Sequence, residues 1–499
     1  MFTIKTELLQ TKKEIVSSEE IDIIDYNYGV LKIISDKTNI TNKNIHIILS
    51  LDRSGSMQGS IDELKHCAKN IVNYLFNKQN GNIYISILFF DHSIETICMQ
   101  EKLIDMDKKE DILCKMLDID IRGTTNIGKV FDTVADLEMN DVDNYHIFMT
   151  DGNPTTGVTK ESKLVEKMQN NINHIVIGFN SDHNGYLMNN MAKTSNELYY
   201  YIDNIENAGM VYGEIIDKIL YKSFTHVNVF DLNETVEFYN MRTSEWVHSL
   251  AMDYICSDET KFVYYRFNWD TTDTIELCVY GTPTNTETPA YGDETYIIPV
   301  LKKINILYDT YTETSESTRN VEIMKHYIRC KSLETIYKII EYYESTRDEY
   351  INSEYKTTLM ELFEKTTRFS REHQLDDDEL MSQIIDNIYV QTRMFYDVNR
   401  NVSLARYIND IEQRSFNIVL QSQYTNTNMV RDIPTQQLVF LPLSNTDIDV
   451  NQLSHIEQYS CEDPQNSYSQ YTPLQRNITA SQYTTPQRLD VMRELSQQN

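Results

Sequence analysis

The chain has 499 residues, which is too long for a single hydrophobic core and predicts roughly three domains. Its 75 acidic and 45 basic residues give a net charge of −30. A surface this acidic repels nucleic acid and anionic lipid, so we expect neither as a general partner.

The first predicted elements are short strands. Residues 1–43 contain strand-like pieces such as GVLKIIS (29–35) but no recognisable motif. A chain that enters and leaves a doubly wound domain often has its ends close together. We therefore expect this N-terminal β segment to pair with a second domain that follows the doubly wound one.

Residues 44–222 alternate between apolar runs and amphipathic segments. The run NIHIILSLD (44–52) is typical of a strand buried on both faces, and IDELKHCAKNIVNYLF (61–76) places its apolar residues on one helical stripe. Further strands are predicted at 83–91, 93–99 (a hairpin partner), 145–151, 174–180 and 198–203, and helices at 109–119, 127–138, 160–169 and 210–220. This rhythm predicts an α/β fold with a doubly wound, mostly parallel, Rossmann-like sheet covered by helices on both faces.

The remaining chain predicts three further regions. Residues 223–310 read as successive strands and predict an antiparallel β domain that resembles a sandwich. Residues 317–415 have helical periodicity and predict a helical region. Residues 416–499 are rich in Gln, Asn, Ser, Thr and Tyr, which predicts a mostly flexible tail with a short helix at 487–497.

One short polar stretch follows the first buried strand of the α/β domain. LDRSGSM (51–57) places Asp52, Ser54 and Ser56 at alternate positions, and alternate side chains of an extended loop point the same way. A carboxylate and two hydroxyls are hard oxygen ligands, which suit Mg²⁺, Mn²⁺ or Ca²⁺ better than zinc. The stretch therefore predicts part of a metal site.

Two later stretches supply further oxygen atoms. RGTTNIG (122–128) has Thr124 and Thr125 just before a predicted helix, and MTDGNPT (149–155) places Asp151 at the end of a predicted buried strand. Open α/β sheets bind ligands at the carboxyl ends of their strands. We expect five oxygen-bearing side chains from three loops at one sheet edge, with either threonine as the fifth.

The three motifs in this order resemble the metal-ion-dependent adhesion site (MIDAS) of a von Willebrand factor type A (VWA) domain, over residues 44–222. The residues that match are Asp52, Ser54, Ser56, Thr125 and Asp151. Where the family usually has Gly-Gly-Thr-Asn, this chain has Gly-Thr-Thr-Asn, and we prefer Thr125 because it precedes Asn126. The resemblance implies Mg²⁺ as the ion, with Mn²⁺ or Ca²⁺ as alternatives.

The resemblance also implies how such a site works. The hydroxyl groups ligate the ion directly, the two aspartates act partly through water, and one open position accepts a Glu or Asp of a partner protein. The family has no ligand at Asp91 or His92, which follow another predicted strand, and we interpret both as turn-capping residues.

The location and source are inferred from composition. No run of about 18 apolar residues predicts a membrane span, and the N-terminus lacks the layout of a signal peptide. Seven scattered cysteines favour reduced thiols and a cytoplasmic location, or a virion if the source is viral. The abundance of Ile, Asn, Lys and Tyr is typical of an AT-rich genome, as in a protist or a large DNA virus.

These features favour binding over catalysis. The sequence has no G-x-S-x-G elbow and no GxxxxGK[ST] loop, and only two carboxylates are placed at the predicted site. We expect an intracellular multidomain protein, not an enzyme, that binds or scaffolds other proteins through the metal. Two alternatives stay open: a structural assembly or virion component in which the ion only stabilises the loops, and a regulatory subunit of an enzyme complex.

Overall fold

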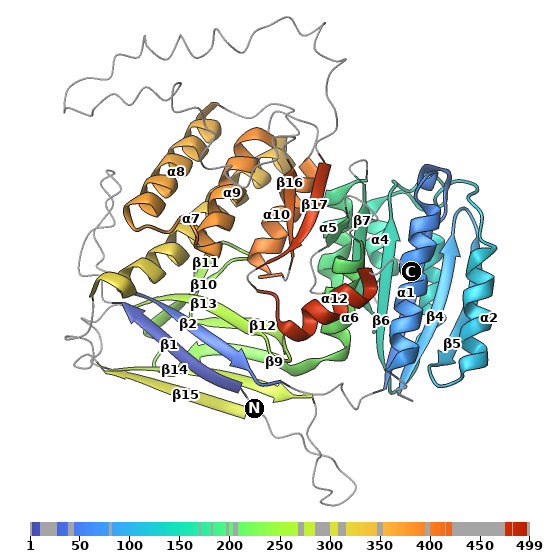
Figure 1. Cartoon of the computed structure of the whole chain (residues 1–499), viewed down its shortest axis with the longest axis horizontal. Helices are drawn as coiled ribbons and strands as arrows, with labels where there is room; N and C mark the ends of the chain where they lie inside the picture. Colours follow the sequence, from blue (N-terminus) through green and yellow to red (C-terminus); the bar gives the residue numbers. More distant parts are fainter. Residues whose placement is uncertain are drawn as a thin grey trace, which may run out of the picture. The chain divides into compact units, whose positions relative to one another are not determined.

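The computed structural model describes residues 2–9, 27–37, 44–78, 82–168, 171–180, 183–195, 199–202, 208–267, 274–284, 300–307, 316–346, 353–394, 400–414, 416–421, 475–481 and 483–496 (Figure 1). The chain forms two compact units, residues 1–417 with 478–499 and residues 418–477. In the part that is described, no helix is long and apolar enough to cross a membrane.

A six-stranded sheet of order β5-β4-β3-β6-β7-β8 forms the core of the α/β region. Its strands are β3 (Ile45–Asp52), β4 (Ile83–Phe90), β5 (Ile94–Lys102), β6 (Asp143–Thr150), β7 (Asn173–Phe179) and β8 (Tyr200–Ile202). All neighbours are parallel except β4 and β5, which form the expected hairpin. The α/β fold with a mixed, mostly parallel sheet is confirmed.

Helices cover this sheet where the apolar stripes predicted them. They are α1 (Ile61–Asn77), α2 (Met106–Leu117), α3 (Ile127–Ala135), α4 (Glu161–Lys167), α5 (Gly185–Ala192) and α6 (Ala208–Leu220), with 3₁₀ turns η1 (Gly55–Met57) and η2 (Lys193–Ser195). All eight residues of β3 are buried, as expected of a strand with helices on both faces. Because β3 is the parallel neighbour of β6, the loops that follow these two strands leave the sheet at the same edge.

The second group of strands forms two antiparallel sheets. One has the order β1-β2-β13-β10-β11 and the other β12-β9-β14-β15. Their bounds are β1 (Phe2–Leu9), β2 (Asn27–Ser35), β9 (Lys222–Asp231), β10 (Val236–Asn240), β11 (Glu245–Val247), β12 (Ser249–Cys256), β13 (Thr260–Phe267), β14 (Thr274–Pro283) and β15 (Val300–Leu307). Residues of both sheets share one apolar core, which includes Leu31, Val229, Phe238 and Leu277. The N-terminal β2 pairs with β13 along its length.

Helices follow these strands along the chain. They are α7 (Glu316–Thr346), α8 (Ser353–Glu372), α9 (Glu379–Met394) and α10 (Arg400–Ile411). A buried ion pair joins two of them, because Arg329 on α7 donates through Nε to Asp410 Oδ1 at 2.8 Å. The boundaries of the separate domains that the sequence suggests remain predictions.

The predicted flexible tail contains ordered elements at its two ends. These are β16 (Phe416–Gln421), β17 (Gln475–Ala480), which pairs with it, and α12 (Pro486–Ser496); residues 422–474 lie outside the described residues. Against the expectation of flexibility, α12 is packed, and Val491, Met492 and Leu495 belong to the α/β core.

Two glycines explain the close approach of α12 to α6. A Cβ atom at Gly213 would lie 2.6 Å from Met492 Cα, and one at Gly209 would lie 2.7 Å from Ser496 Cα. Real side chains do not tolerate such contacts with backbone, so only glycine lets the two helices pack at this distance. Asn70 on α1 adds a hydrogen bond to the carbonyl of Leu495 at 3.0 Å.

Buried charges accompany this helix contact. Arg488 on α12 donates through Nε to Asp217 on α6 at 2.8 Å, and its Nη1 lies 3.4 Å from Glu259 Oε1 in the β12–β13 turn. Lys261 lies 3.2 Å from the same carboxylate oxygen. We call Asp217, Glu259, Lys261 and Arg488 the junction cluster, and it links the α/β region, the antiparallel strands and α12.

Candidate metal centre

Three loops place the predicted oxygen-bearing side chains together at one edge of the α/β sheet. Asp52 ends β3, Ser54 and Ser56 follow it into η1, and Asp151 follows β6 directly. Thr125 comes two residues before α3. All are buried except Ser56, which is exposed at the mouth of the group.

Hydrogen bonds connect the members of this group. Ser54 Oγ lies 3.0 Å from Ser56 Oγ, and Ser56 donates through Oγ to Asp151 Oδ1 at 2.7 Å. The two oxygens of Asp52 accept from the Ser54 amide at 2.7 Å and from the Thr150 hydroxyl at 2.5 Å. Asp52 therefore braces the loop, while the two serines and Asp151 place their oxygens in direct contact.

The structure places the two candidate threonines differently. Thr125 is buried, and its Oγ1 points toward the group: a Cβ atom at Gly152 would lie 3.7 Å from it and 3.6 Å from Ser56 Oγ. Thr124 is exposed, and its hydroxyl lies 3.2 Å from that of Thr156. The hydroxyl of Thr125 thus shares the space around Gly152 with Ser56 Oγ, whereas that of Thr124 contacts Thr156.

Asp52 is buried with no basic side chain from the described part of the chain beside it, which disfavours its ionised form. Burial raises the pKa of Asp52 to about 6, although hydrogen bonds from Thr150 and Ser54 oppose this rise, and the nearby Asp151 adds to it. No Lys or Arg of the described residues contacts this carboxylate. A bound cation would remove this penalty, because a nearby positive charge favours the ionised form.

The donor set fits a hard divalent cation. In an octahedral Mg²⁺ site with bonds of about 2.1 Å, neighbouring ligand oxygens lie about 3.0 Å apart. The separations of 3.0 Å between Ser54 and Ser56 and of 2.7 Å between Ser56 and Asp151 are close to this value. Among the described residues, no group of three or more His, Cys, Asp or Glu side chains could hold a metal, so a site here would rely on hydroxyl groups.

Comparison with known families agrees with this arrangement. The model of the von Willebrand factor type A domain matches residues 46–214, which contain all three loops. These residues form a VWA domain. VWA domains generally mediate protein–protein interaction or adhesion, and they commonly bind a divalent metal.

Solved structures resemble the chain only distantly. The ArnB paralog VWA2 from Sulfolobus acidocaldarius is 16% identical, with 82% of this chain and 97% of that chain covered and a TM-score of 0.45. A von Willebrand factor type A protein from Catenulispora acidiphila is 10% identical (77% and 89% covered, TM-score 0.48). Proximal thread matrix protein 1 from the mussel byssus, with a zinc-occupied MIDAS motif, is 20% identical (37% and 48% covered, TM-score 0.30). No curated protein matches the sequence.

Asp91 has a larger role in the VWA domain than the sequence indicated. Its carboxylate does accept from Ser93 in the following turn, as a capping residue would, but it also binds Arg53 and Arg122 in two of the site loops. Burial opposes ionisation, yet hydrogen bonds from Ser93 and the two arginines lower the pKa of Asp91. The signal in the sequence was a buried-strand end followed by an acid, the same signal that marks Asp52 and Asp151.

A second polar cluster lies inside the VWA sheet and was not anticipated. His46 contacts Asn144 Oδ1 at 3.1 Å and Ser86 Oγ at 2.8 Å, and His146 contacts Ser50 Oγ and His174 Nδ1, both at 2.9 Å. Burial lowers the pKa of all three histidines. Both ring nitrogens of His46 and His146 already have protein partners, so we interpret this cluster as structural.

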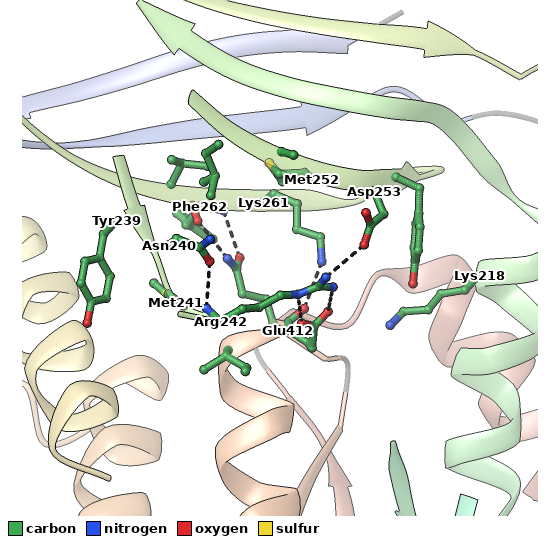
Figure 2. Close-up of a pocket in the computed structure, with 16 residues that line it drawn as sticks. Lys218, Tyr239, Asn240, Met241, Arg242, Met252, Asp253, Lys261, Phe262 and Glu412 are labelled. Atoms are coloured by element: carbon green, nitrogen blue, oxygen red, sulfur yellow. Dashed lines mark hydrogen bonds and ion pairs between the residues drawn. The ribbon is translucent and has the colours of Figure 1, made fainter. Parts of the chain in front are cut away.

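A cavity of about 110 Å³ has none of the predicted site residues in its lining, and Figure 2 shows the residues that do line it. Arg242 crosses it, donating to the two carboxylate oxygens of Glu412 at 2.7 and 2.9 Å and to Asp253 at 3.1 Å. Lys218 and Lys261, which also line it, are ion-paired as well. Because the basic side chains lining this cavity already have acidic partners, we assign no ligand to it.

Proposed function

We propose that this protein binds a partner protein through a divalent cation held at the edge of its VWA sheet. Ser54, Ser56 and Thr125 would hold the cation through their hydroxyl oxygens, with Asp52 and Asp151 supplying negative charge. The cation would keep an open position for a Glu or Asp of the partner, and Mg²⁺ is the ion that the ligand chemistry favours.

One observation carries this proposal. The oxygen atoms of Ser54, Ser56 and Asp151 form a continuous chain of contacts at 3.0 and 2.7 Å, with Thr125 beside it and Ser56 open to solvent. The group thus combines a buried floor with an accessible mouth, as a site that presents a cation to another molecule requires.

A binding role fits this group better than a catalytic one. Two carboxylates and three hydroxyls can hold one ion, whereas the two-metal hydrolytic sites use clusters of acids about two ions roughly 4 Å apart. The open side of the site would then serve recognition, in which a partner carboxylate completes the coordination of the ion.

Calorimetric titration of the full chain with MgCl₂, MnCl₂ and CaCl₂ tests the proposal. We expect saturable binding of one ion per chain, lost in Asp151→Ala and kept in Asn153→Ala, which alters an exposed residue of the same loop. Absence of binding in the wild-type chain, or equal binding by Asp151→Ala, would overturn the metal site. Partners captured by the wild-type chain should be released by EDTA and not retained by Asp151→Ala.

A further inference from the structure

Asp91 occupies the centre of a network at the end of β4, the strand beside β3. Its Oδ1 accepts from the amide of Ser93 at 2.6 Å and from the hydroxyl of the same residue at 2.8 Å. Its Oδ2 accepts from Nε of Arg53 at 3.1 Å and from Nε of Arg122 at 3.0 Å. Its main-chain carbonyl accepts from the amide of Asn126 at 3.0 Å. Asp91 thus contacts the loop that carries Ser54 and Ser56, through Arg53, and the loop that carries Thr125, through Arg122 and Asn126.

The two arginines lie within the loops that carry the hydroxyl groups, which we call the serine loop (residues 52–57) and the threonine loop (residues 122–126). Arg53 stands between Asp52 and Ser54, and Arg122 stands three residues before Thr125. The loops are also joined directly, because the amide of Arg122 donates to the carbonyl of Arg53 at 3.0 Å. Holding the two guanidinium groups therefore also restrains the backbone of the two loops that carry the site oxygens.

Glu95 on β5 completes the network. Arg53 Nη1 donates to Glu95 Oε2 at 2.5 Å, and Arg122 Nη2 donates to the same oxygen at 3.3 Å. The two arginines and the two acids of this network balance in formal charge. Arg53 is 2% exposed and Asp91 0%, whereas Arg122 and Glu95 are 55% and 44% exposed, so Asp91 and Arg53 form the buried part of the network.

A glycine allows the threonine loop to approach this network. Gly123 has φ of +76°, a left-handed conformation, and a Cβ atom there would lie 2.3 Å from His92 Nδ1. The amide of Gly55 donates to the carbonyl of Gly123 at 3.2 Å, which adds another link between the serine loop and the threonine loop. The two loops are therefore held close by contacts within the chain itself.

We infer that Asp91 is a positioning residue of the metal centre: through Arg53 and Arg122 it holds the serine loop and the threonine loop in the geometry that brings Ser54, Ser56 and Thr125 together before a cation arrives. This inference rests on the proposed function, because its expected consequence is tighter binding of the cation. Asp91 itself does not touch the site oxygens. Residues behind a metal ligand that fix its orientation typically change metal affinity by about 10- to 100-fold.

Two variants and one control test this role in the full chain. Asp91→Asn keeps the shape of the side chain and removes its charge, and Arg122→Gln removes the more exposed of the two arginines. Asp132→Asn alters an exposed acid on α3 and serves as the control. We expect Mg²⁺ affinity, measured by calorimetry, to fall about 10- to 100-fold in Asp91→Asn, less in Arg122→Gln, and not in the control.

Two further readouts separate positioning from general loss of structure. Amide hydrogen exchange in EDTA should accelerate at residues 53–57 and 122–126 in Asp91→Asn, with β3 and β6 still protected. The electron paramagnetic resonance spectrum of bound Mn²⁺ should broaden in both variants, because the ligand oxygens become less ordered. If Asp91→Asn lowers protection across the whole sheet, Arg122→Gln decides the question through the same measurements.

The failure of this inference is distinct from that of the proposed function. Wild-type Mg²⁺ affinity and unchanged loop exchange in both variants would overturn the positioning role while leaving the metal site intact. A wild-type chain that binds no cation would overturn the proposed function, and the exchange measurement in EDTA would still show whether Asp91 holds the two loops.

Discussion

Asp52 and Glu259 are both buried carboxylates, 0% and 2% exposed, but only Glu259 has basic side chains of the described residues beside it. Glu259, in the junction cluster, lies 3.2 Å from Lys261 and 3.4 Å from Arg488. Asp52, at the sheet edge, receives hydrogen bonds from neutral groups of Ser54 and from the Thr150 hydroxyl. The basic residue closest to it along the chain, Arg53, is directed to Asp91 instead.

The pKa values follow from this difference. Burial would raise the pKa of Glu259, but Lys261, Arg488 and the amide of Cys256 together lower it to about 2. For Asp52, burial prevails and the pKa rises to about 6. Glu259, with its basic partners, stabilises the fold in its ionised form, whereas ionised Asp52 lowers the stability of the fold unless a cation binds beside it. The comparison therefore separates a structural cluster from a site that is suited to bind something.

Removing Arg488, the central basic residue of the junction cluster, should have the largest effect on the free energy of unfolding. Arg488→Met leaves Asp217 and Glu259 buried without their shared partner, and breaking a buried pair in this way typically costs about 3–5 kcal/mol in the free energy of unfolding. Urea denaturation in EDTA measures this loss. Arg493→Met, on the same helix but 66% exposed, should change the unfolding free energy by less than about 0.5 kcal/mol.

A loss below about 1 kcal/mol in Arg488→Met would contradict the comparison. It would mean that water or rearranged side chains replace Arg488, and that the junction cluster contributes little to the fold. The buried position of α12 would then rest on Met492, Leu495 and the close helix contact at Gly213.

The pH dependence of stability should show the same cluster. The pKa of Glu259 in the folded chain, about 2, lies below its ordinary value of 4.5, so the folded state binds fewer protons between these values. Its stabilisation is fully present above about pH 4.5 and is lost as the pH falls toward 2, a change of about 3 kcal/mol. Burial raises the pKa of Asp217 despite Arg488, which offsets part of this change.

Urea denaturation of the wild-type chain and of Glu259→Gln at several pH values measures this contribution. The difference in unfolding free energy between the two should be largest above about pH 4.5 and should shrink toward pH 2. A difference that stays constant over this range would show that Glu259 acts through packing or hydrogen bonding, such as its bond from the Cys256 amide at 2.8 Å, and not through charge.

Much of the α/β region could be predicted because its signals are local. The continuous apolar run of β3 indicated a strand buried on both faces, and the oxygen-bearing residues directly follow strand ends or precede a helix. Parallel neighbours leave their loops at one edge, so Asp52 and Asp151 could be placed together without coordinates.

The features that were missed depend on contacts between distant residues. Asp91 meets Arg53 and Arg122 across 38 and 31 residues, so its position at the end of a buried strand did not reveal its two arginine partners. Arg488 meets Asp217 across 271 residues, and the short helix expected at 487–497 gave no sign that it packs against the glycines of α6.

The smallest predicted effect on the free energy of unfolding is that of Asp52→Asn, and it is the one that does not lower stability. Asp52→Asn removes a buried charge that no Lys or Arg of the described residues offsets, so in EDTA at pH 7.5 it should leave the free energy of unfolding unchanged or raise it by about 1 kcal/mol. The Thr150 hydroxyl, which now donates to Asp52, can turn and accept from the new amide. Asp62→Asn, on the exposed first turn of α1, is the matched control and should change stability by less than about 0.5 kcal/mol.

Addition of Mg²⁺ sharpens this test. A ligand at about 100 times its dissociation constant stabilises the folded state by about 2.7 kcal/mol, and Asp52→Asn should forfeit most of that gain while the control keeps it. If Asp52→Asn lowers the free energy of unfolding in EDTA by more than about 1 kcal/mol, Asp52 resembles Glu259, an acid whose charge the fold already compensates. The sign of the change in unfolding free energy of Asp52→Asn thus decides whether the charge of Asp52 is uncompensated without a cation or is already compensated by the fold.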